Sequence, residues 1–127
     1  MKLSNERIIN DAAKLKEIAQ KQLPIKVSYA LAKNIAKIDS ELKIYNKERE
    51  KLIDKYAEKD EKGNIISYEN GNIKIKYDCI EDFNKDNKEL LEIENEIEIH
   101  QFNFSLLDGY NNISAAELMA IDYMIEE

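Results

Sequence analysis

The stretch LAKNIAKIDSELKIYNKEREKLIDKY, residues 31–56, decides the fold. Its apolar positions step by four and three residues, which is the repeat of a coiled-coil seam, and Arg49 is the one exception. The stretch contains neither Gly nor Pro, so it predicts a single long helix. A helix with one apolar stripe needs partners, and the rest of the chain is expected to supply them. The seam consists of Leu31, Ile35, Ile38, Leu42, Tyr45, Arg49, Leu52 and Tyr56.

Further helices are expected on both sides of this seam. Ser4 is a suitable N-cap for a first helix. Asp78 with Glu81, and Ser114 with Glu117, have the spacing of capping boxes that open two later helices. The alternating apolar pattern of residues 97–104 indicates a short strand or extended segment between those two helices. The predicted helices cover about residues 4–21, 24–57, 79–96 and 115–126.

The dipeptide Asn70-Gly71 predicts a β-hairpin over about residues 65–77. Apolar residues alternate with polar ones on both sides of it, and Asn-Gly between such segments is typical of a two-residue type I′ turn. That turn would pair Tyr68 with Ile73 and Ile66 with Ile75. Because an isolated two-stranded hairpin is marginal in water, its apolar face is expected to rest on a helix or on a partner.

These elements predict one domain, residues 1–127, of a mostly α class with a small β-hairpin (α+β). At about 1.5 Å per residue the second helix would span roughly 50 Å, and the first and third helices about half of that. We therefore expect a long antiparallel helical hairpin with the β-hairpin at its tip and a short C-terminal helix. No internal repeat is apparent.

Composition and charge narrow the function classes. The chain is 43% hydrophobic and 35% charged and has a net charge of −7. Residues 1–59 carry 14 Lys and Arg against 9 Asp and Glu, whereas residues 60–127 carry 5 against 17. The halves therefore have net charges of +5 and −12, which disfavours direct nucleic-acid binding. No apolar run has the length of a membrane span and no signal peptide is apparent, so we expect a cytoplasmic protein that contacts no membrane.

The search for a catalytic site finds little. The only histidine, His100, has no nucleophile and orienting group at catalytic spacing, and a metal there would need ligands from elsewhere besides Glu96. Cys79 is the only cysteine, which excludes an intrachain disulfide and a Cys/His zinc site of the usual kind. The glycines are isolated in turns and form no phosphate-binding loop. The sequence predicts no enzyme and no cofactor.

An acidic ladder along the third predicted helix is the most suggestive polar feature. A row of carboxylates can occupy a basic groove built for phosphates. The simpler interpretation is a solvated helix face that lysines of the second helix partly neutralise. Two tyrosines of the predicted hairpin could anchor a partner as well. The candidate partner-binding residues are Asp82, Asp86, Glu89, Glu92, Glu96, Tyr68 and Tyr77.

Three stretches resemble an uncharacterised family of short phage and prophage proteins from low-GC Gram-positive bacteria. They are LPIKVSYALAKNI at residues 23–35, EKDEKGN at residues 58–64 and ISAAEL at residues 113–118. The resemblance covers nearly the whole chain, and its motifs are a helix start, a turn and a capping box. It brings no catalytic residue. It implies a viral context, in which small acidic proteins are virion or assembly parts, or inhibitors of host machinery.

Two hypotheses of function follow. In the first, the chain is a phage-encoded inhibitor that binds a host protein or ribonucleoprotein with a basic groove, such as a CRISPR effector, in the host cytoplasm. In the second, it is a virion or tail-assembly protein that self-associates through the helical seam. A homodimer is left open under either hypothesis.

Overall fold

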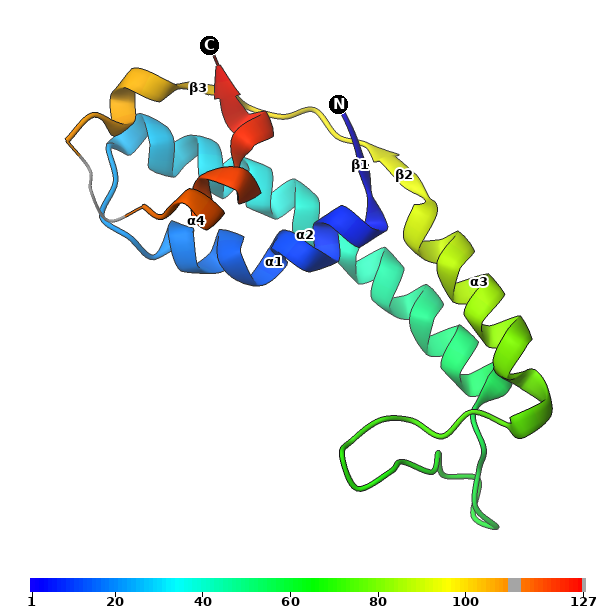
Figure 1. The fold of residues 1–127 in the computed structure, drawn as a ribbon. Helices are drawn as coiled ribbons and strands as arrows, with labels where there is room; N and C mark the ends of the chain where they lie inside the picture. Colours follow the sequence, from blue (N-terminus) through cyan, green and yellow to red (C-terminus); the bar gives the residue numbers. More distant parts are fainter. Residues whose placement is uncertain (110–112, 127) are drawn as a thin grey trace. The chain divides into compact units, whose positions relative to one another are not determined.

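The computed structural model describes residues 1–109 and 113–126, and the chain separates into two compact units (Figure 1). Residues 1–42 and 94–127 belong to the first unit, and residues 43–93 form the second. The sequence predicted one domain, so this division is a finding of the structure. The long helix α2, Ile25–Tyr56, contributes residues to both units and matches the predicted second helix within one residue at each end.

The fold is mostly helical with small β elements, as the sequence predicts. The first unit contains α1 (Asn5–Ala19), the first part of α2, and α4 (Ala115–Ala120). Strand β1 (Lys2–Ser4) pairs antiparallel with β2 (Glu94–Glu96). Strand β3 (Phe102–Asn103) pairs in parallel with β4 (Ile125–Glu126). Two 3-10 helices, η2 (Phe104–Leu107) and η3 (Asp122–Met124), precede α4 and β4 respectively.

The main hydrophobic core lies in the first unit. It collects side chains from α1, from the first part of α2, and from the extended and 3-10 segments near the C-terminus. The predicted cap of α1 is present, because Ser4 Oγ accepts a hydrogen bond of 3.1 Å from the backbone of Arg7. The buried core residues are Leu3, Ile8, Leu15, Ile18, Val27, Ala30, Leu31, Ile38, Ile97, Phe102, Leu107, Ile121, Tyr123 and Met124.

The coiled-coil seam of α2 is buried as predicted. Leu31, Ile38, Tyr45 and Tyr56 are buried, and Ile35, Leu42 and Leu52 are partly buried. The exception, Arg49, is exposed, and the neighbouring Ile53 is buried instead. The single chain therefore covers most of its own seam.

Two predicted helices are shorter in the structure. The third was expected over residues 79–96, but α3 spans Ile80–Glu92, because Ile93 is extended and residues 94–96 pair with β1. The last was expected over residues 115–126, but α4 ends at Ala120 and residues 125–126 pair with β3. In both places strand pairing supplies backbone hydrogen bonds that a continued helix would otherwise provide. The predicted capping box of Ser114 and Glu117 is present.

In the second unit α3 runs back beside the end of α2 (Figure 1). The Tyr56 and Phe83 rings make an edge-to-face contact with centroids 6.2 Å apart. A 3-10 helix, η1 (Tyr77–Cys79), leads into α3, whose N-cap is Cys79. The predicted capping box of Asp78 and Glu81 is therefore wrong, since Asp78 lies within the 3-10 turn and not at the helix boundary.

Residues 57–76 form a closed ring of three extended segments, which we call the tip ring and which is coloured green in Figure 1. A cycle of backbone hydrogen bonds closes it: Glu58 donates to Lys74, Lys74 to Ile66, and Ile66 to Glu58, at 2.8–2.9 Å. Each segment therefore pairs with both others. The isolated bridges are Ala57 with Ile75, Lys59 with Ile65, and Ser67 with Ile73.

The tip ring corrects the predicted hairpin. Ile73 lies opposite Ser67 and not opposite Tyr68, so the register differs by one residue. A type I′ turn needs positive φ at both central residues, but Asn70 lacks it and only Gly71, at 86°, has it. The segment before the hairpin completes the pairing, so the chain itself supplies the third strand that an isolated hairpin lacks.

The tip ring also contains an internal repeat of eight residues, which the sequence did not make apparent. The three hydrogen-bonded residues of the cycle, 58, 66 and 74, are eight positions apart. Gly63 and Gly71, both with φ near 85°, begin the two copies of Gly-Asn-Ile at residues 63–65 and 71–73. Their amides bond to Asp60 and Tyr68, three residues back, and Cys79 bonds to Lys76 in the same way.

Among residues 1–109 and 113–126, no helix combines the length and the hydropathy needed to cross a bilayer.

Candidate functional site

The structure separates the predicted acidic ladder. Asp82, Asp86 and Glu89 lie on α3, and Glu92 is its last residue. The sequence predicted that Glu96 shares a helix face with Glu89 and Glu92. This prediction is wrong, because Glu96 lies in β2 in the first unit. The alternating pattern that begins at Ile93 was the sequence signal for this change from helix to strand.

Glu96 already has a partner within its own unit. Its carboxylate accepts a hydrogen bond of 2.8 Å from the amino group of Met1, and this bond holds the pKa of Glu96 below its usual value. Glu96 could contribute to a partner-binding face only if its hydrogen bond to the amino group of Met1 opened.

Asp86 is tied to the end of α2. The hydroxyl of Tyr56 donates a hydrogen bond of 2.7 Å to Asp86 Oδ2, and this bond is the first cause of a raised pKa at Tyr56. Asp82 and Glu89 are exposed, and the described part of the chain contains no ion pair of either residue. Glu92 lies 3.9 Å from Lys88 on the outer side of α3.

A groove of about 440 Å³ runs between α2 and α3 within the second unit. Its floor is apolar, the α2 wall carries two lysines and Glu48, and the α3 wall carries two carboxylates. Tyr56 beside it, and then Asp86 and Asp82, raise the pKa of Lys55, so this lysine stays charged. Lys51 forms an ion pair of 3.0 Å with Glu48. The groove is lined by Glu48, Lys51, Leu52, Lys55, Asp86, Glu89, Leu90 and Ile93.

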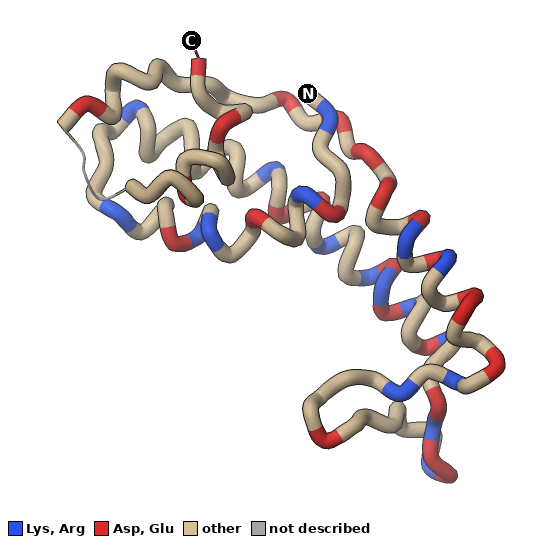
Figure 2. Tube along the Cα trace, in the orientation of Figure 1, with Lys and Arg blue, Asp and Glu red and all other residues tan. Residues whose placement is uncertain are grey.

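The charge of the second unit is close to balanced. Residues 43–93 carry 11 Lys and Arg against 13 Asp and Glu, a net charge of −2, because the last part of α2 brings lysines beside the acidic α3 (Figure 2). The first unit carries 8 against 13, a net charge of −5. The −12 of the second half of the sequence is therefore not the charge of any one unit.

The two tyrosines predicted from the hairpin are exposed. Tyr68 lies at a corner of the tip ring with 54% of its surface exposed, and Tyr77 in η1 is 90% exposed. Both therefore present large amphipathic side chains on a hydrogen-bonded support.

The structure describes the surroundings of His100 and Cys79, the two residues that were weighed for catalysis and not selected. The backbone of His100 is held by Asn34, which accepts from His100 N at 2.8 Å and donates to His100 O at 2.9 Å. Burial, and then the carboxylate of Asp78, raise the pKa of the Cys79 thiol, which disfavours the reactive thiolate. In the part of the chain that the structure describes, no three His, Cys, Asp or Glu residues gather as metal ligands.

Comparison with known proteins gives no match: no family model, no curated protein and no solved structure is significantly similar to this chain.

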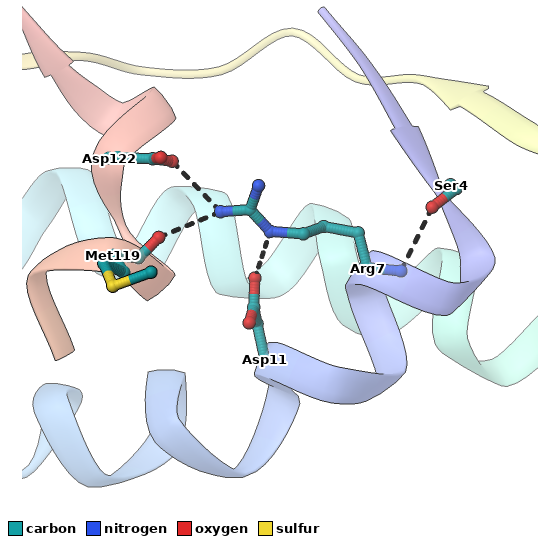
Figure 3. A network of polar contacts seen from close by, with 5 residues as sticks. All are labelled: Ser4, Arg7, Asp11, Met119 and Asp122. Carbon is teal, nitrogen blue, oxygen red and sulfur yellow. Dashed lines mark hydrogen bonds and ion pairs between the residues drawn. The ribbon is translucent and has the colours of Figure 1, made fainter. Parts of the chain in front are cut away.

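The sequence did not reveal one polar network of the first unit, centred on Arg7 (Figure 3). Its guanidinium pairs with Asp11 one helical turn away and, at 3.0 Å each, with Asp122 and the carbonyl of Met119. It also lies 5.1 Å from the centre of the Tyr123 ring. The spacing of Arg7 and Asp11 is a detectable helical pair, but the contacts to residues 119–123 depend on the tertiary fold. The network links α1 to the C-terminal segment.

Proposed function

We propose that the protein is a phage-encoded, non-enzymatic binding protein that inhibits a host nucleic-acid-handling defence complex, in the manner of an anti-CRISPR protein. The observation that carries the proposal is the exposure of Tyr68 and Tyr77 in and beside the tip ring. Tyrosines are enriched among the residues that dominate binding energy, and a support cross-linked by backbone hydrogen bonds reduces the entropy lost on binding.

The carboxylates of α3 that stay outside internal contacts supply the electrostatic part of the proposed surface. Asp82 is exposed and lies in the first turn of α3, five residues after Tyr77 in the chain. Such a carboxylate beside aromatic anchors favours a partner with a basic groove. Because the second unit has a net charge of only −2, we assign the larger part of the binding energy to the tyrosines.

The alternative function is a virion or tail-assembly protein that self-associates through the seam of α2. Burial of Leu31, Ile38 and Tyr45 within the single chain argues against that seam as a contact between copies. The long antiparallel helical hairpin with the tip ring at its end remains part of the proposal.

A plasmid-interference assay tests the inhibitor proposal. Cells that carry an RNA-guided nuclease lose a targeted plasmid, and expression of this protein is expected to preserve it. The Tyr68→Ala/Tyr77→Ala variant should bind the purified effector more weakly by at least about 30-fold and should not preserve the plasmid, because hot-spot truncations cost about 2 kcal/mol or more.

Tyr29→Ala is the matched control, because Tyr29 is 56% exposed but lies in the first unit. It should protect the plasmid as well as the unchanged protein does. Equal activity of the Tyr68→Ala/Tyr77→Ala variant would contradict the assigned surface. Failure of the unchanged protein against each effector tested would favour the assembly function instead.

A further inference from the structure

The groove of the second unit leaves apolar surface without cover within that unit. Ile93 lines it with half of its surface exposed. Ile44 on α2 is 59% exposed. It precedes Glu48 by four residues, Lys51 by seven and Lys55 by eleven, and this helical spacing places all four residues on the same stripe of α2. Ile44 on α2 and Ile93 at the end of α3 are two exposed large aliphatic side chains of this unit, and exposed apolar surface beside an apolar floor is typical of a contact surface.

Charge is ordered across this groove. The α2 wall carries Lys51, Lys55 and Glu48, which pairs with Lys51, so its net charge is +1, whereas the α3 wall carries Asp86 and Glu89 and has a net charge of −2. The apolar floor of Leu52 and Leu90 lies between them. A partner of matching chemistry must therefore present acidic groups, an apolar row and basic groups in that order.

We propose that this partner is a second copy of the same chain, which packs groove to groove about a two-fold axis parallel to the groove. That rotation brings the lysine wall of each copy opposite the carboxylate wall of the other. A two-fold axis perpendicular to the groove would instead place lysines opposite lysines and carboxylates opposite carboxylates, which costs free energy. The charge order thus selects one arrangement, a four-helix bundle in which the two α2 helices are parallel.

This arrangement has a consequence for binding. Because the axis is parallel to the groove, both tip rings lie at the same end of the bundle. Two sets of Tyr68 and Tyr77 would then face a partner together, and binding of the first set would raise the effective concentration of the second. This consequence rests on the proposed function, whereas the dimer itself does not, so the two can fail separately.

Sedimentation of the full chain across about 1 to 500 µM tests the dimer, since α3 is short and gives only a small interface of modest affinity. The unchanged protein should reach the mass of a dimer. Lys51→Glu/Lys55→Glu and Asp86→Lys/Glu89→Lys should each stay monomeric, because each double reversal places like charges across both contacts. An equimolar mixture of these two variants should form a heterodimer, because both of its contacts become complementary.

Two further variants serve as a control for charge reversal outside the groove and as a test of its apolar surface. Lys85→Glu changes an exposed residue of α3 that does not line the groove, and it should dimerise like the unchanged protein. Ile93→Ser truncates a half-exposed side chain, and it should weaken the dimer at least tenfold while the circular dichroism spectrum is unchanged. A monomeric unchanged protein, a dimer that tolerates both Ile93→Ser and the lysine reversals, or a mixture that stays monomeric would each overturn the proposal.

Discussion

The first unit buries the large side chains Ile18, Val27 and Ile121 completely, whereas the large buried side chains of the second unit keep 7–8% of their surface exposed. The first unit joins α1, α2, α4 and two small sheets around one core. The second packs only α3 against the end of α2, and backbone hydrogen bonds hold its tip ring. Apolar burial therefore stabilises the first unit, and local backbone pairing contributes a larger share in the second.

The unit with the larger apolar core is also not the unit that carries the proposed binding surfaces. Exposed apolar side chains of the second unit include Ile44, Tyr68, Tyr77 and Ile93, and the proposed contacts use them. A unit with few deeply buried contacts is expected to open more readily than a unit with a continuous core. The predictions below test this comparison, from the largest expected effect to the smallest.

Leu31→Ala should be the most destabilising single change. Leu31 is 1% exposed in the core of the first unit, and truncation there leaves a cavity, so we expect a loss of about 2–5 kcal/mol in the free energy of unfolding. Leu52→Ala in the second unit, where the side chain is only partly buried, should cost clearly less. Urea denaturation measures both. Equal costs would contradict the stated difference between the units.

Asn34→Ala should destabilise the first unit by about 1–3 kcal/mol, since it leaves the backbone N–H and C=O of His100 without their partner. The expected local result is faster hydrogen exchange at the His100 amide. Asn84→Ala, on the exposed side of α3, is the matched control and should have little effect. If both variants unfold at the same urea concentration, the buried amide contributes nothing to stability.

Gly71→Ala should weaken the tip ring by about 1–2 kcal/mol. A Cβ atom would meet no neighbour within 4 Å, so the cost arises from the φ angle of 86° and not from a clash. Hydrogen exchange should accelerate at the amides of Tyr68 and Lys74, while the amides of the first unit keep their rates. Loss of protection in both units would show that they unfold together.

Tyr123 should make the first unit sensitive to high pH. Burial raises its pKa from 10.0 to about 12, so the unfolded chain loses this proton at a lower pH than the folded chain does. The stabilisation is complete below pH 10 and is lost as the pH rises toward 12, with about 1 kcal/mol lost at pH 11. Comparison of the unchanged protein with Tyr123→Phe isolates this effect, and Tyr29→Phe should not change the pH profile.

Several elements were predictable because they depend on nearby residues. The seam spacing predicted α2 within one residue at each end, and Ser4 and Ser114 predicted two helix starts. The exposure of Tyr68 and Tyr77 agrees with their proposed role as anchors, although the binding itself stays a prediction. The sequence predicts the groove walls only in part. The helical spacing of Lys51 and Lys55 is visible in the sequence, but their position opposite Asp86 depends on how α3 packs against α2.

The sequence by itself determined the helical class, the long α2 with its seam, and the turns at Gly63 and Gly71, because periodicity, caps and positive φ are local properties. Only the tertiary structure decided where α3 stops, how the tip ring closes and that the chain has two units. Glu94–Glu96 becomes a strand because β1 lies beside it, and Ser67 meets Ile73 because residues 57–60 complete the ring. Such pairings join residues far apart in the chain, and no local pattern selects among them.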